Sequence, residues 1–119
     1  MNINALSELE LARYYMVEQQ IRPWYVEDEK VLQALMQTPR ENFVPPAYKA
    51  MAFADTEVPL VIDSVDTNEY MLKPVIEARL ALSLELSPSD GVLEIGTGSG
   101  YQAALLAQLA QQVTSVEIN

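Results

Sequence analysis

The sequence contains neither cysteine nor histidine among its 119 residues. Without cysteine it can form no disulfide and no thiolate zinc site. Without histidine it lacks the commonest general base, the serine–histidine–aspartate triad and the commonest metal ligand. Any chemistry must therefore run without imidazole or thiol, and we predict no metal site.

Basic residues are also scarce: seven lysines and arginines stand against 17 acids, for a formal net charge of −10. They are scattered along the chain, which argues against nucleic acid and against an anionic membrane surface as partners. No apolar run approaches the roughly 20 residues of a membrane span, and the N-terminus lacks the layout of a signal peptide. We predict a soluble, cytoplasmic protein that binds neither nucleic acid nor membrane.

Hydrophobic residues make up 50% of the chain, which is enough for the core of one domain. Helices are predicted at residues 6–21, 27–37 and 74–84, with a short helical turn at 46–51. The first should end at Arg22, because a residue before proline is pushed out of the α region. The polar segment 63–68 is predicted to be a surface loop.

The C-terminal part alternates strand and helix. Residues 92–95 are predicted to form a buried strand, 101–111 a helix and 113–118 a second strand, with a glycine-rich loop after the first strand. Such a βαβ unit pairs its strands in parallel. The fold class is therefore α/β: a helical N-terminal cap followed by the first βαβ unit of a Rossmann-like domain. We divide the chain into a cap (1–45), a connecting loop and helix (46–90) and the start of the core (91–119).

The glycine-rich loop has the composition of a ligand-binding turn. Gly96, Gly98 and Gly100 supply positive φ and close backbone approach, and the helix that follows presents free N–H groups. Glu117 lies at the end of the second strand, where a carboxylate can accept both hydroxyls of a ribose. The alternatives are that the glycines merely make a turn and that Glu117 is a solvated acid.

The spacing of the loop favours a cationic ligand. A dinucleotide fingerprint would place its third small residue at position 101, which is Tyr101. The acid Glu94 would repel a pyrophosphate, whereas S-adenosylmethionine carries a sulfonium and an ammonium group and no phosphate. We predict that S-adenosylmethionine binds at the residues Glu94, Gly96, Thr97, Gly98, Ser99, Gly100 and Glu117. Glu94 could equally bond the loop N–H groups.

Several segments resemble the protein-L-isoaspartate O-methyltransferases: residues 16–21, 39–45, 54–55, Pro74 and 92–101. The resemblance implies a class I methyltransferase domain that transfers a methyl group to isoaspartyl carboxylates in damaged proteins, a repair reaction. Its partner would be a protein or peptide substrate. An anionic carboxylate needs no general base, so catalysis would be mainly positioning in a site shielded from water.

One position departs from the family. Where the family has a serine that orients the substrate carboxylate, this chain has Leu72. Losing a hydrogen bond worth roughly 1.5–3 kcal/mol would lower turnover or redirect specificity. Asp55 is a second catalytic candidate, with capping of loop N–H groups as its alternative. A methyltransferase with another acceptor, or a non-catalytic interaction module, therefore stays open.

The chain also has few strands for its class. A domain of this kind needs roughly five or more strands, and only two are convincing in the sequence. We therefore expect a single incomplete domain, inactive by itself, with self-association through the exposed strand at 113–118.

Overall fold

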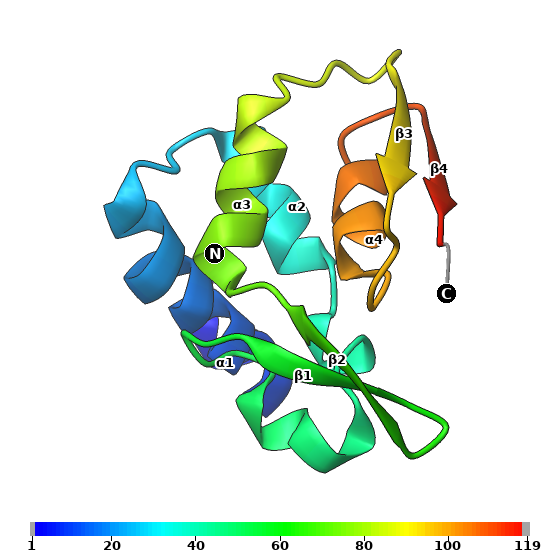
Figure 1. The fold of residues 1–119 in the computed structure, drawn as a ribbon. Coiled ribbons are helices and arrows are strands. Elements are labelled where there is room, and N and C mark those ends of the chain that lie inside the picture. Colours follow the sequence, from blue (N-terminus) through cyan, green and yellow to red (C-terminus); the bar gives the residue numbers. More distant parts are fainter. Residues whose placement is uncertain (1, 118–119) are drawn as a thin grey trace.

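The computed structural model describes residues 2–117. Its elements, in chain order, are η1 (Ile3–Ala5), α1 (Glu8–Met16), η2 (Val17–Ile21), η3 (Arg22–Trp24), α2 (Glu29–Gln37), η4 (Arg40–Asn42), η5 (Pro46–Met51), β1 (Val58–Ile62), β2 (Val65–Met71), α3 (Pro74–Ser83), β3 (Gly91–Ile95), α4 (Tyr101–Ala107) and β4 (Gln112–Val116). Figure 1 shows α2 and α3 above the β1–β2 hairpin, and the β3–β4 pair beside α4 at the right-hand edge.

The N-terminal helix begins at a capping box. Ser7 and Glu10 exchange hydrogen bonds between side chain and backbone, which satisfies N–H groups at the start of α1. The predicted helix is confirmed as α1 continued by the π-helical η2. The reason predicted for its end is wrong, because Arg22, the residue before the proline, keeps α-region angles (φ −55°, ψ −42°). A 3-10 turn accommodates the proline in its first positions, and Tyr25, with φ 65°, ends it.

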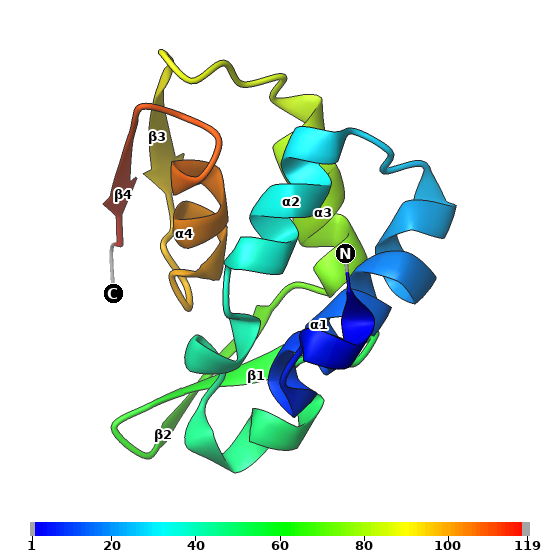
Figure 2. The ribbon, with the colours of Figure 1, turned by 180° about the vertical axis from the view of Figure 1, so that it is seen from behind.

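The helices α2 and α3 form the middle of the molecule. The carboxylate of Asp28 accepts the N–H groups of Lys30 and Val31 and so begins α2. Pro74 stands in the first turn of α3, as predicted. Figure 2 shows the two helices side by side above the hairpin.

The prediction of a surface loop at 63–68 is wrong for residues 65–68, which belong to β2, whereas Asp63 and Ser64 form an exposed turn. The strands β1 and β2 pair antiparallel around a tight turn at Asp63 and Ser64, whose φ angles are 51° and 65°. Two successive left-handed residues give the turn geometry whose twist suits a hairpin. Thr67 donates its hydroxyl to the carbonyl of Leu60, across a register shift between Pro59 and Val61. Residues 2–117 thus contain four strands rather than the expected two.

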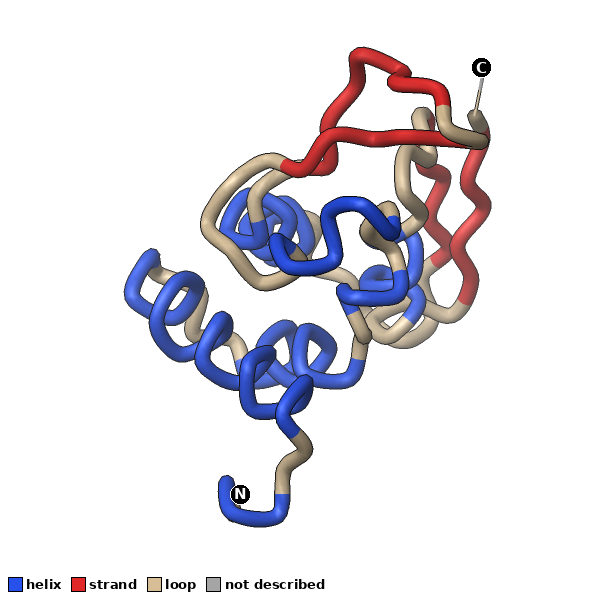
Figure 3. Tube along the Cα trace, turned by 90° about the horizontal axis from the view of Figure 1, so that it is seen from below, coloured by secondary structure: helices blue, strands red, loops and turns tan. Residues whose placement is uncertain are grey.

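The βαβ unit is confirmed. β3 pairs in parallel with β4, from Gly91 opposite Gln112 to Ile95 opposite Val116, and Figure 3 shows both strands beside α4. The expected burial of the first strand is wrong for the described residues, because α4 covers one face and Ile95 stays 66% exposed on the other. α4 also ends at Ala107, before the predicted residue 111.

Tight turns follow the end of α4, in which the N–H groups of Gln108 and Leu109 donate to the carbonyls three residues earlier. The N–H groups of Gln111 and Gln112 then donate to the carbonyl of Asp90, beside the start of β3. The second strand is confirmed as Gln112–Val116, and Glu117 follows it outside the strand. Residue 118, the last of the predicted range, lies outside the described residues.

The core joins all of these parts. Its most deeply buried apolar side chains include Met16, Ile21, Leu35, Val58, Tyr101 and Leu105. Because these come from the cap helices, the hairpin and α4, the helical cap and the βαβ unit share one core. Within residues 2–117, every helix is too short or too polar to cross a lipid bilayer.

Candidate functional site

The glycine loop turns the chain sharply from β3 into α4. Gly96, Gly98 and Gly100 have φ angles of 90°, 58° and 87°, values that suit glycine. The N–H of Gly96 donates to the carbonyl of Val116 (2.7 Å), and the N–H of Gly100 donates to that of Thr97 (3.0 Å). The loop is therefore closed on itself and fastened to β4.

Both predicted acids bond to this loop or to the strand beside it. Ser115 donates its hydroxyl to Glu94 Oε1 (2.6 Å). Since that proton is used, Thr97 Oγ1 must be the donor in its 2.7 Å contact with Ser115 Oγ. Glu117 Oε2 accepts the N–H of Gly98 at 2.9 Å. Glu117 therefore holds the loop directly, and Glu94 holds it through Ser115 and Thr97.

Two adjoining cavities open at the loop. The first, about 290 Å³, is bounded by Leu60, Tyr70, Met71, Leu72, Glu77, Leu80, Glu94, Ile95, Gly96, Thr97, Gly98, Ser99 and Gln102. The second, about 430 Å³, is bounded by Glu57, Leu60, Glu69, Tyr70, Gly96, Gly98 and Glu117. Leu60 and Tyr70 of the hairpin line both, so the hairpin that the sequence did not predict forms the wall opposite the loop.

Most of the predicted site residues meet there. Leu72 lines the first cavity with its apolar side chain 37% exposed, and its carbonyl is held from behind by Arg40. Ser99 also lines it and accepts the N–H of Tyr101. Asp55 does not join them: it is exposed in the connection before β1 and lines neither cavity.

A buried arginine connects the cap to the site. Arg40 is fully buried, donates to the carbonyls of Ala52 (2.9 Å) and Leu72 (2.6 Å), and lies over the ring of Tyr101 at 4.6 Å. Phe43 packs edge-on against the same ring. Burial lowers the pKa of Arg40 and raises that of Tyr101 to about 12. The segment 39–45 therefore fastens the cap to the first residue of α4.

Glu77 is a site residue that the sequence did not reveal. It lies on α3, is 5% exposed and lines the first cavity. Burial raises its pKa to about 7, opposed by the charge of Arg40 and reinforced by that of Glu94. No local pattern marks it, because α3 is apolar around most of its surface.

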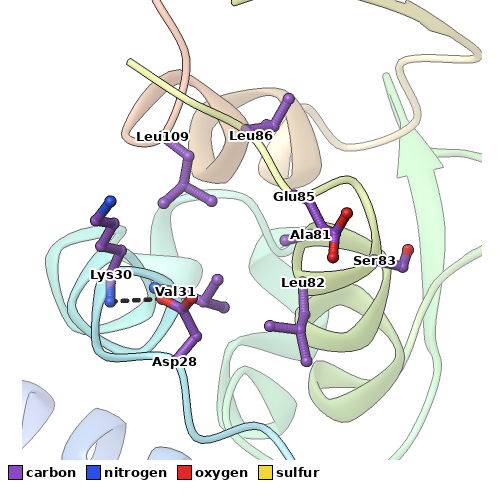
Figure 4. Close-up of a pocket in the computed structure, with 9 residues that line it drawn as sticks. All are labelled: Asp28, Lys30, Val31, Ala81, Leu82, Ser83, Glu85, Leu86 and Leu109. Atoms are coloured by element: carbon purple, nitrogen blue, oxygen red, sulfur yellow. Dashed lines mark hydrogen bonds between the residues drawn. The ribbon is translucent and has the colours of Figure 1, made fainter.

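A larger cavity of about 510 Å³ lies elsewhere, between α2, α3 and the turn after α4. Figure 4 shows its walls, among them Lys30, Leu82, Glu85 and Leu109. The carboxylate of Asp28 points to the start of α2, where it caps the helix. No residue of the glycine loop borders this cavity. Among residues 2–117, no three acids gather as metal ligands either.

The strand, glycine loop, helix and parallel strand, with an acid-lined cavity at the loop, define a Rossmann-like protein of the methyltransferase type. A family model described as protein-L-isoaspartate(D-aspartate) O-methyltransferase matches residues 12–119. The chain therefore belongs to the protein-L-isoaspartate O-methyltransferase family.

Individual relatives agree. The chain is 47% identical over 106 residues to the protein-L-isoaspartate O-methyltransferase of Picosynechococcus sp., with 89% of this chain and 46% of that protein covered. For the enzyme of Gloeobacter violaceus the identity is 42% over 103 residues, with 87% and 48% covered. The chain spans about half the length of the curated relatives it matches.

Solved structures share the fold. A protein-L-isoaspartate O-methyltransferase superposes with a TM-score of 0.68 at 26% identity, over 92% of this chain and 34% of that one. A Plasmodium falciparum chain described as a beta-aspartate methyltransferase, in complex with S-adenosyl-L-homocysteine, gives 0.66 at 19% identity, over 88% and 48%.

Proposed function

We propose that this protein uses S-adenosylmethionine to methylate the carboxylate of isoaspartyl residues in damaged proteins. The observation that carries the proposal is an acid-lined cavity at the glycine loop of a chain that belongs to this family. Damaged proteins or peptides would be the substrates, and the cytoplasm the place of action.

The charges of the two cavities fit this methyl donor. The lining residues include the acids Glu57, Glu69, Glu77, Glu94 and Glu117, and none of those described is lysine or arginine. Such a lining attracts a cation and repels a phosphate. Thr97, Gly98 and Ser99 would hold the donor at the loop, with Glu94 below it and Glu117 at the ribose.

The chain's own residues supply position rather than acid–base catalysis. The bound donor would supply a methyl group activated by its sulfonium, for transfer to the substrate oxygen with a neutral thioether as the leaving group. The substrate carboxylate already carries the attacking electron pair, so no proton has to move. Arg40 holds the backbone at Leu72, at the cavity wall, through its 2.6 Å hydrogen bond.

The test supplies the complete gene product with two peptide substrates and compares their methylation. Labelled S-adenosylmethionine is supplied with an isoaspartyl peptide and with the same peptide carrying ordinary aspartate. We expect label in the isoaspartyl peptide alone. Label in a different acceptor would favour a related methyltransferase, and donor binding without any transfer would favour a non-catalytic module.

Leu72 is the feature that favours a different acceptor, because its side chain offers no hydrogen-bond donor to a carboxylate. Leu72→Ser adds such a donor, and Leu72→Ala removes the leucine without adding one. A gain in isoaspartyl methylation by Leu72→Ser of about tenfold over Leu72→Ala would support a pocket built for the isoaspartyl carboxylate. Equal rates for the two variants would count against it.

A further inference from the structure

Glu77 has the features of a ligand-binding carboxylate rather than a structural one. It is 5% exposed, lines the first cavity, and its Oε2 is buried without a hydrogen-bond partner in the part of the chain that the structure describes. A buried carboxylate in this condition carries a large desolvation cost. Such a cost is recovered when a bound cation or donor supplies the missing contacts.

The neighbouring cation offsets only part of the cost of burying Glu77. Arg40 donates Nε to the carbonyl of Ala52 and Nη2 to that of Leu72, and its Nη1 is buried without a hydrogen-bond partner among the described residues. It acts on Glu77 through its charge, yet no ion pair within 4 Å joins the two among residues 2–117. The hydroxyl of Tyr101 completes the surroundings and also lacks a hydrogen-bond partner there.

Two buried acceptors belong to residues that border the cavity. They are Oε2 of Glu77 and the carbonyl oxygen of Gln102, and neither has a hydrogen-bond donor among the described residues. Glu94 lies on the same wall and receives the hydroxyl of Ser115. A group with several N–H donors and a positive charge would satisfy these acceptors, and a primary ammonium has both properties.

We propose that Glu77 binds the ammonium group of the methyl donor's amino-acid portion. The donor then lies across both cavities, with its amino-acid end beside Glu77 and its ribose beside Glu117, because Leu60, Gly96 and Gly98 border the two cavities in common. This inference rests on the proposed function and adds to it a residue that the glycine motif does not contain.

The experiment measures affinities by calorimetry in the complete gene product. S-adenosylmethionine is compared with 5′-methylthioadenosine, which keeps the adenosine and the sulfur but lacks the amino-acid portion. We expect Glu77→Gln to weaken S-adenosylmethionine binding by about 10- to 100-fold. For 5′-methylthioadenosine we expect a change below about threefold.

The matched control is Glu85→Gln, which removes the same charge from the separate cavity between α2 and α3. It should leave both affinities unchanged. Equal losses for both ligands in Glu77→Gln, or no loss for either, would overturn the role of Glu77. Failure of the unmodified protein to bind S-adenosylmethionine at all would overturn the proposed function as well, so the two failures can be told apart.

Two further measurements separate binding from a structural role. Because Glu77→Gln removes a buried charge without an ion pair, its thermal midpoint should equal or exceed that of the unmodified protein; a fall would contradict the proposal. Affinity for S-adenosylmethionine should drop as the pH falls through about 7, where Glu77 gains its proton. Arg40 and Tyr101 do not titrate in this range. Glu77→Gln, a variant that keeps Glu94, should therefore lack this part of the pH dependence.

Discussion

Replacing Arg40 by methionine should destabilise the protein severely. The substitution keeps a long side chain but leaves the carbonyls of Ala52 and Leu72 without their donor. A buried carbonyl left unpaired costs roughly 1–3 kcal/mol; that of Ala52 is buried, and that of Leu72, which is partly buried, adds less. The lost contact with the ring of Tyr101 adds about 1 kcal/mol. Removing the buried charge of Arg40 offsets part of this loss of stability. We therefore expect the free energy of unfolding to fall by about 3–5 kcal/mol.

Denaturant titration of the complete gene product measures this loss. Arg79→Met is the matched control, because Arg79 also donates to a carbonyl, that of Trp24, but is exposed; it should cost below about 0.5 kcal/mol. Arg40→Lys should not rescue stability, since one ammonium cannot reproduce the guanidinium fork. A loss below about 1 kcal/mol for Arg40→Met would refute the view that this side chain fastens the cap to the site.

Two further predictions concern the loop and the buried acid. Gly100→Ala should lower the free energy of unfolding by about 1–2 kcal/mol, because a φ of 87° strains any residue with a side chain. Gly91→Ala is the control: its added methyl group meets nothing within 4 Å at an ordinary φ, so it should be nearly neutral in the same denaturant titration. Equal losses for the two variants would contradict this prediction. The pKa of Glu77 is raised to about 7 from 4.5, so the folded state holds its proton longer, and stability should fall by roughly 3 kcal/mol as the pH rises from 4.5 to 7. Glu77→Gln should flatten that slope in thermal melts across this pH range, and an unchanged slope would assign it to other groups.

Structural features that depend on residues close together in the sequence were predictable. The βαβ unit, the loop with its three positive φ angles and the start of α3 at Pro74 follow from periodicity and from glycine and proline chemistry. The position of Glu117 just after the second strand followed from the sequence, whereas its hydrogen bond with the N–H of Gly98 was not predicted. Local chemistry decides each of these features, so sequence patterns are sufficient.

The hairpin was missed because its turn does not carry the usual residues. Asparagine or aspartate followed by glycine marks a two-residue turn with positive φ, whereas this turn is Asp63–Ser64. The middle of the strand after it, residues 66–69, is polar and mostly exposed, which removes the alternation that indicates a strand. Pairing with β1 decides its structure, and that pairing is a tertiary contact.

The buried acid was missed for a different reason. Glu77 stands between Ile76 and Ala78 in a helix where apolar residues occur on most sides, so periodicity cannot say which side faces the core. In the structure Ile76 is 42% exposed while Glu77 is 5% exposed, an inversion of the order that hydrophobicity predicts. Arg40 lies 37 positions earlier in the chain, and only the packing of the cap onto α3 and α4 brings its charge to the carboxylate. An acid placed inside at the expense of an isoleucine costs stability, and a ligand cation in the adjoining cavity is the partner that would offset the cost.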